Sequence, residues 1–159
     1  MSGMEDARPL PQGWVWATLG ELAANEPNAM TDGPFGSNLK SEHYTDQGAR
    51  VVRLGNIGVG RFVDDDQVFI SEERLVSLTK HCCFPGDLLI AALAEPVGRC
   101  ARVPDDLGPA IVKADCIRMK VHGHLNTDYV LHALNSPSGL ARTAESSHGI
   151  GRLRINLGE

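Results

Sequence analysis

The sequence predicts a mixed α/β domain of the α+β kind, in which a twisted and mainly antiparallel sheet is accompanied by a few short helices. Its 159 residues are 42% hydrophobic and 22% charged, a composition typical of a globular protein with one core. There are 17 glycines and 9 prolines but only 5% aromatic residues, so turns separate short apolar segments rich in Val, Leu, Ile and Ala. Such segments predict short strands.

The chain begins with a polar stretch that has no apolar pattern. We therefore expect residues 1–9 to form a disordered leader and residues 10–159 to form one domain. Order should begin at residues 10–16, where both tryptophans of this aromatic-poor chain, Trp14 and Trp16, predict an anchoring strand.

Further strands are indicated by apolar runs between turn residues. A tight turn at Pro85 and Gly86 leads into the most apolar run, which we expect at the centre of the sheet. An acidic run interrupts one of the others. The expected strands cover residues 49–54, 61–70, 88–91, 98–103, 110–112 and 116–121.

Short helices are indicated by residues that cap helix N-termini. Thr18 and Glu21 have the spacing of a capping box, and Ser71 precedes two acidic residues that favour a first turn. The expected helices begin at Thr18 (ending near Asn25), at Ser71, at Asn126 or Thr127, and at Pro137.

Residues 32–40 form the most informative loop, because two glycines and a proline exclude both a helix and a strand interior. Ser37, Asn38 and Lys40 add a hydroxyl, an amide and a cation. Side chains of these kinds contact phosphates and base edges. The alternative is a plain connection, which is the commoner role of such loops.

The charge distribution limits the support for a nucleic-acid role. A formal net charge of -5 argues against a generally basic surface, since phosphate contacts need Lys and Arg on one face. Arg118 and Lys120 would share a strand face, as would Arg152 and Arg154 in a closing strand that follows two glycines. The alternative is that these cations are scattered and solvated.

No residue pattern indicates catalysis or a metal site. The sequence has no P-loop and no G-x-S-x-G elbow, and Asp87 after a Pro-Gly turn is more typical of a turn-stabilising carboxylate than of a base. The cysteines lack C-x2-4-C spacing and lie in predicted strands, so we expect reduced, buried thiols. The alternative is a metal-dependent enzyme that uses Cys82, Cys83, Cys100 and Cys116 with nearby histidines.

The sequence shows neither a secretory leader nor an apolar run of the roughly 18 to 20 residues needed to span a bilayer. We therefore expect a cytoplasmic protein.

Several ordered segments together resemble the DNA specificity (S) subunit of type I restriction-modification systems. They are residues 10–14 (LPQGW), 19–22 (LGEL), 32–37 (DGPFGS), 53–57 (RLGNI) and 85–89 (PGDLL), followed by 97–99 (VGR), 134–136 (LNS) and 149–156. The resemblance implies a single target recognition domain, a non-catalytic unit that reads one half of a bipartite DNA site. It implies double-stranded DNA, methyltransferase (M) subunits and, through them, restriction (R) subunits as partners. ATP and S-adenosylmethionine would belong to those partners, so no cofactor is expected here.

We expect the long spacer helices that separate recognition domains in this family to be absent from this sequence, which would be a departure from the family. A protein-interaction module derived from such a domain therefore remains a further alternative. Within the DNA-binding interpretation, contact should centre on the loop and on separated cationic or amide side chains. The candidate DNA-binding residues are Ser37, Asn38, Lys40, Arg53, Asn56, Arg99, Arg118, Lys120 and Arg152.

Overall fold

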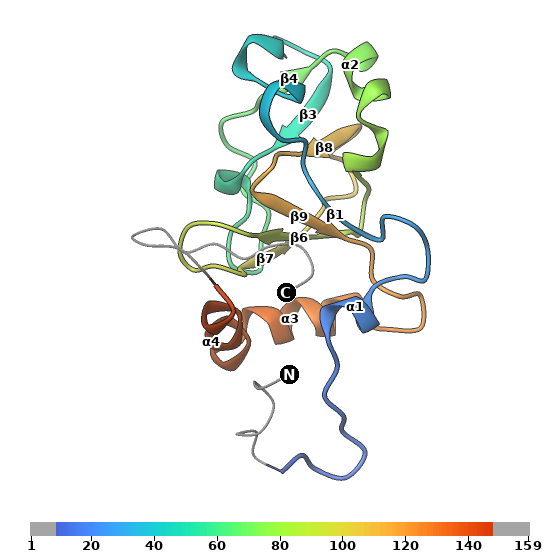
Figure 1. Ribbon diagram of the computed structural model, residues 1–159, viewed down its shortest axis with the longest axis vertical. Coiled ribbons are helices and arrows are strands. Elements are labelled where there is room, and N and C mark those ends of the chain that lie inside the picture. The colour runs from blue at the N-terminus through green and yellow to red at the C-terminus, as the bar shows by residue number, and fades with distance from the viewer. Residues whose placement is uncertain (1–8, 148–159) are drawn as a thin grey trace.

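The computed structural model describes residues 9–147, which form two stacked β-sheets with short helices at both ends (Figure 1). In Figure 1 the five-stranded sheet and α2 lie at the top, the four-stranded sheet lies in the middle, and α1, α3 and α4 lie at the bottom. The predicted leader lies outside the described residues except for Pro9.

The four-stranded sheet is antiparallel throughout, with the strand order β1-β9-β6-β7. Its interior strand β6 is the apolar run that follows the Pro-Gly turn, and all four of its residues are buried. The prediction of a central strand at this position is therefore confirmed. The strands are β1 (Met30–Asp32), β6 (Leu88–Ala91), β7 (Cys100–Arg102) and β9 (Cys116–Met119).

The five-stranded sheet has the order β2-β4-β3-β8-β5 and contains one parallel pair, β3 with β8. The strands are β2 (Tyr44–Thr45), β3 (Ala49–Val52), β4 (Phe69–Ile70), β5 (Cys82–Cys83) and β8 (Ala110–Val112). The expectation of a mixed α/β fold with mainly antiparallel pairing is confirmed. The expectation of a single sheet is wrong. The chain passes from the five-stranded sheet to the four-stranded sheet in the short turn between β8 and β9, so the strands divide between two sheets.

The capping residues do what the sequence predicted. Thr18 and Glu21 form a reciprocal capping box, and the side chains of Ser71, Asn126 and Ser136 accept backbone N–H groups of the helices that they precede. The helices are α1 (Leu19–Leu22), α2 (Glu72–Ser77), α3 (Thr127–Asn135) and α4 (Pro137–Glu145). Four 3-10 turns occur among the described residues: η1 (Gly36–Asn38), η2 (Ser41–His43), η3 (Leu54–Asn56) and η4 (Thr79–His81).

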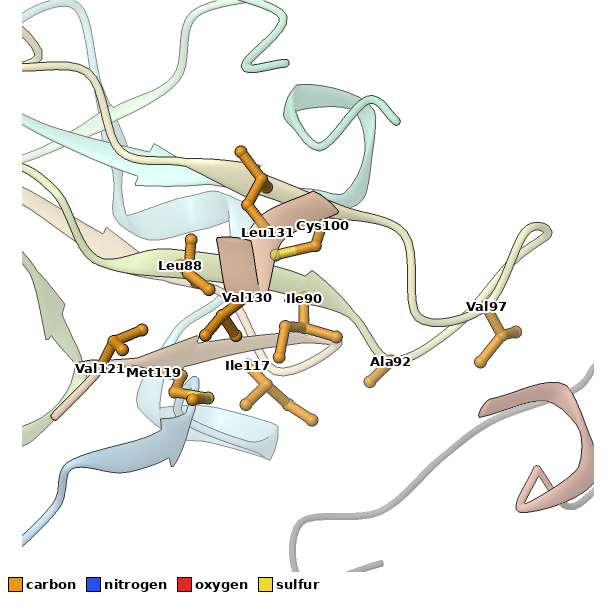
Figure 2. Close-up of a cluster of buried hydrophobic side chains, with 10 residues drawn as sticks. All are labelled: Leu88, Ile90, Ala92, Val97, Cys100, Ile117, Met119, Val121, Val130 and Leu131. Carbon is orange, nitrogen blue, oxygen red and sulfur yellow. The ribbon is translucent and has the colours of Figure 1, made fainter. Parts of the chain in front are cut away.

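Strand β6 supplies side chains to two cores because successive residues of a strand point to opposite faces. Leu88 and Ile90 pack with β9 and α3 in the cluster shown in Figure 2. Leu89 and Ala91 point the other way, into the space between the two sheets. Burial on both faces explains why this strand is continuously apolar rather than alternating.

The strand predicted at residues 10–16 is not formed. Trp14 and Trp16 remain 57% and 45% exposed. Their rings contact helices instead: Trp14 lies edge-on to Tyr129 of α3, with centroids 6.4 Å apart, and the guanidinium of Arg142 in α4 lies 4.1 Å from the centroid of Trp16. Side-chain contacts with helices have replaced the backbone pairing that a strand would need.

The strand predicted at residues 61–70 is reduced to β4 at its end. The side chains of the acidic run before β4 pair with Arg50 of β3 and with Arg53, which lies just after that strand. Asp64 accepts a hydrogen bond from Arg50 at 2.6 Å, and Asp66 accepts one from Arg53 at 2.6 Å. Side-chain pairing of this kind holds the segment beside the sheet without a backbone ladder.

Gly33 joins β1 to the loop at a place where backbone meets backbone. A Cβ at this position would lie 2.1 Å from the carbonyl carbon of Lys113, immediately after β8. Only glycine allows this approach, because backbone cannot move aside as a flexible side chain can. The base of the loop is therefore fixed against the five-stranded sheet.

We expect Gly33→Ala to lower the free energy of unfolding by about 1–3 kcal/mol, because the added methyl group overpacks this contact. Gly55→Ala is the matched control, since a Cβ at Gly55 meets no atom within 4 Å. It should change stability by less than about 0.5 kcal/mol. Urea unfolding measures both variants, and equal losses would contradict the close approach at Gly33.

Candidate nucleic-acid interface

The loop at residues 33–40 is anchored at both ends and exposed between them. Gly33 and Pro34 are buried at one end, and Leu39 is buried in the core cluster of the five-stranded sheet at the other. The tip is the 3-10 turn η1, and Gly36 begins it with a φ of 61°, which glycine adopts readily. Ser37, Asn38 and Lys40 are all exposed. The predicted shaped loop is confirmed, and it presents polar side chains from a fixed base.

Helix α2 fixes the tip through one side chain. Nη2 of Arg74 donates to the carbonyl oxygen of Asn38 at 3.0 Å and contacts both ring nitrogens of His43, at 2.8 Å from Nδ1 and 2.7 Å from Nε2. The same Nδ1 accepts the backbone N–H of Lys40 at 2.9 Å. The sequence did not indicate this contact, because Arg74 follows Asn38 by 36 residues and no local pattern links the two.

Two lysines lie at or near this loop. Lys40 is exposed, and no carboxylate of the described residues lies within 4 Å of its ammonium group. Nζ of Lys113 donates to the hydroxyl of Tyr44 at 3.0 Å and lies 5.6 Å from the centre of that ring. Lys113 was not among the predicted DNA contacts, although its backbone lies directly against Gly33 at the start of the loop.

Arg53 lies at the edge of a shallow cleft of about 360 Å³ that Lys113 also lines. Its Nη2 pairs with Oδ2 of Asp66 at 2.6 Å, and its side chain is 29% exposed. Three carboxylates, those of Asp65, Asp66 and Asp115, line the cleft as well. Because both cations and carboxylates line it, the cleft lacks the single sign of charge that draws in a phosphate.

Asn56 is 3% exposed, and its amide is occupied within the protein. Its Oδ1 accepts the backbone N–H of Arg53 at 2.9 Å, while its Nδ2 donates to the carbonyls of Val63 and Asp65 at 2.9 and 3.1 Å. These bonds hold η3 against the acidic run. The amide is therefore not presented to a ligand.

Arg99 is also buried, and its guanidinium donates to four backbone carbonyls. The distances are 2.6 Å to Ile57, 3.1 Å to Leu54, 3.0 Å to Ala94 and 3.4 Å to Pro96. Burial lowers the pKa of Arg99, yet arginine remains charged in proteins. This cation joins η3 to the turn between β6 and β7, and it does not face solvent.

Arg118 is enclosed together with Asp87. Each side chain is 7% exposed, and Nε of Arg118 lies 3.9 Å from Oδ2 of Asp87. Asp87 accepts the backbone N–H of Phe84 at 2.9 Å, which confirms its predicted turn role. Burial raises the pKa of the Asp87 carboxyl, and the Phe84 N–H and Arg118 oppose that rise.

Lys120 lies one residue beyond β9 and is half exposed. Its Nζ forms an ion pair with Glu26, at 3.0 and 3.1 Å from the two carboxylate oxygens. Arg118 and Lys120 both act on the Asp87 carboxyl, which agrees with their expected position on one strand face. Arg152 lies outside the described residues.

The predicted site residues that the structure describes thus fall into three groups. Ser37, Asn38 and Lys40 are gathered on the exposed loop, whereas Asn56, Arg99 and Arg118 serve the interior. Arg53 and Lys120 lie at the surface, where each already pairs with a carboxylate.

The cysteines are buried and reduced, as the sequence predicted. Burial raises the pKa values of Cys83, Cys100 and Cys116 to about 12, so these thiols stay protonated and unreactive. Within residues 9–147, no group of three or more His, Cys, Asp or Glu side chains is arranged to hold a metal ion. No helix in this range is long and apolar enough to cross a bilayer.

Comparisons with known proteins place this fold beside two solved structures. One is a chain from a study of complex assembly and conformational transition in the type I restriction-modification (R-M) system: TM-score 0.57, 21% identity, covering 84% of this chain and 30% of that one. The other is the HsdS subunit from Thermoanaerobacter tengcongensis: TM-score 0.52, 19% identity, covering 86% of this chain and 34% of that one.

At the sequence level, no family model matches the chain and no curated protein matches it. At identities this low, the structural likeness establishes a shared fold. The chain spans about a third of the length of each solved chain that it matches.

We expect Asn56→Ala to lower the free energy of unfolding by about 2–3 kcal/mol, because it leaves a buried N–H and two carbonyls without their partner. Asn38→Ala is the control, since it makes the same chemical change on the exposed loop, and it should cost less than about 0.5 kcal/mol. Urea unfolding distinguishes the two. A wild-type midpoint for Asn56→Ala would show that this amide is dispensable to the fold.

Proposed function

We propose that this chain is a DNA target recognition domain of a type I R-M specificity subunit, the part that reads one half of a bipartite site. The observation that carries the proposal is the shared fold, which extends over 84% of the chain. Such a domain delivers sequence specificity to M subunits and, through them, to R subunits. Its DNA partner would place it in the cytoplasm.

The loop at residues 33–40 is the proposed centre of the DNA interface. It combines an exposed cation, an exposed amide and an exposed hydroxyl in a loop whose anchored ends cannot shift freely. Phosphate contacts position a protein on DNA, and amide or hydroxyl groups can read base edges in the major groove. In this proposal Lys40 contacts phosphate, and Ser37 and Asn38 face the bases.

Arg53 and Lys120 are proposed as secondary phosphate contacts. Each would exchange a carboxylate partner for a phosphate when DNA binds, and surface ion pairs are worth only about 0–1 kcal/mol. The proposal assigns no direct base contact to Asn56, Arg99 or Arg118, because their polar groups are enclosed. Few cations therefore act on DNA, and binding by the domain alone should be weak.

Lys40→Ala should weaken binding to every DNA sequence, because it removes a phosphate contact. The slope of log K against log salt should become shallower by about 0.9, the contribution of one phosphate contact to B-DNA. Fluorescence anisotropy on a random-sequence duplex at several salt concentrations measures this, with the purified chain and with its M subunits.

Arg142→Ala is the matched control for that experiment, since it removes one positive charge from α4 at the opposite end of the molecule (Figure 1). Its salt slope should stay at the wild-type value. Identical slopes for Lys40→Ala and Arg142→Ala would mean that the loop does not contact phosphate.

The purified chain should neither methylate nor cut DNA when S-adenosylmethionine, ATP and Mg²⁺ are supplied. The nearest approach to a methyltransferase Asn-Pro-Pro-aromatic motif is at Asn135, whose amide is engaged with both backbone groups of Cys100 at 2.8 Å. That side chain closes the edge of β7 and is not available to a base. Transfer of labelled methyl groups to duplex DNA by the chain alone would overturn the non-catalytic assignment.

A further inference from the structure

The tip of the 33–40 loop is tied to α2 through two side chains that no sequence pattern indicated. Arg74 is the third residue of α2, and the hydroxyl of Ser71 accepts its backbone N–H at 3.2 Å. The arginine therefore projects from a capped helix N-terminus. From there, Nη2 reaches the carbonyl of Asn38 and the ring of His43.

His43 is the common partner of this network. Its Nδ1 accepts the backbone N–H of Lys40 at 2.9 Å, while Nη2 of Arg74 lies 2.8 Å from Nδ1 and 2.7 Å from Nε2. Because Nη2 is nearly equidistant from the two ring nitrogens, Arg74 contacts the ring as a whole, and the Nδ1 lone pair is used by the Lys40 N–H.

We propose that Arg74 and His43 are positioning residues for DNA binding, which set the backbone of Asn38 and Lys40 so that the exposed side chains of the loop meet the duplex together. The inference rests on the proposed function of this loop. Neither residue needs to touch DNA. Arg74 holds a carbonyl on one side of Leu39, and His43 holds an amide on the other, so the loop keeps one shape before it binds.

Loop order is measured first, without DNA, by amide hydrogen exchange at Asn38, Leu39 and Lys40. Arg74→Lys keeps the charge but loses the forked donor geometry, so exchange of the Lys40 amide should become about tenfold faster than in the wild type. Exchange in β6 should be unchanged, which shows that the fold is intact. Wild-type exchange at Lys40 in this variant would overturn the positioning role.

DNA affinity is measured second, on the same random-sequence duplex used for Lys40→Ala. Arg74→Lys should weaken binding about fivefold to tenfold although its net charge is unchanged, and a role of charge alone would be rescued by lysine. Faster exchange with unchanged affinity would overturn the inference that loop shape controls binding. The Lys40→Ala result tests the DNA interface separately, so the two failures can be told apart.

His43→Ala tests the second positioning residue. It removes the acceptor of the Lys40 N–H, so exchange of that amide should become about tenfold faster and DNA affinity should fall. His124→Ala is the control, because that exposed histidine lies beside His122 and should change neither quantity. Wild-type exchange and wild-type affinity in His43→Ala would overturn its positioning role.

Discussion

The buried guanidinium of Arg99 is the interaction on which the relation between the two sheets depends. It bonds to η3, which follows a strand of the five-stranded sheet, and to the turn between two strands of the four-stranded sheet. Burying an arginine without a paired carboxylate is costly, and the cost is offset only when its donors are all directed at acceptors. Hydrogen bonds from a charged donor contribute about 1.5–3 kcal/mol each, so four carbonyls can meet that demand. Two turns that are distant in sequence are thereby held at one fixed separation.

The same logic explains why the sequence segments that resemble the family are informative about the fold and less so about DNA. Asn56, Asp87 and Arg99 each come from such a segment, and each satisfies backbone groups within the molecule. Gly33 belongs to another segment, and its lack of a side chain allows a backbone contact. The architecture requires these residues for its own packing. In the proposed function, readout of a particular DNA sequence would come from side chains that the architecture leaves exposed.

The sequence was a reliable guide wherever structure is decided locally. Thr18, Ser71 and Pro137 act within one turn of helix, and the apolar run of β6 is buried on both faces whichever strands lie beside it. Long-range features were not accessible in this way. The exposed position of Trp14 depends on Tyr129, and the split into two sheets depends on the pairing of β3 with β8. Hydrophobic periodicity indicates that a side chain is buried, but it does not identify the residues against which the side chain packs.

The residues of the candidate site show the same contrast between locally decided and long-range features. Side-chain type and loop chemistry pointed to Ser37, Asn38 and Lys40, and these are exposed together. The same reasoning also selected Asn56, Arg99 and Arg118, because an amide or a guanidinium has the same chemistry whether it is buried or exposed. It missed Arg74, whose importance arises only from a contact across the fold. Burial and partners are tertiary properties, so a list of polar residues could not separate the two groups.

Charge pairing has a consequence for how an acidic domain could bind DNA. Arg53, Arg102 and Lys120 each have a carboxylate within 4 Å, so these surface cations are locally neutralised, and the formal net charge of the chain is -5. The long-range attraction that draws generally basic proteins onto any duplex is therefore weak here. In the proposed function, discrimination between DNA sequences would benefit, because non-specific binding would compete less with the correct site. Affinity would then come from elsewhere: a second DNA-binding unit in the same assembly would raise the effective concentration of this domain at its half of the site. A weak domain whose loop has a fixed shape suits that arrangement, because ordering a flexible loop would consume part of the little binding free energy available.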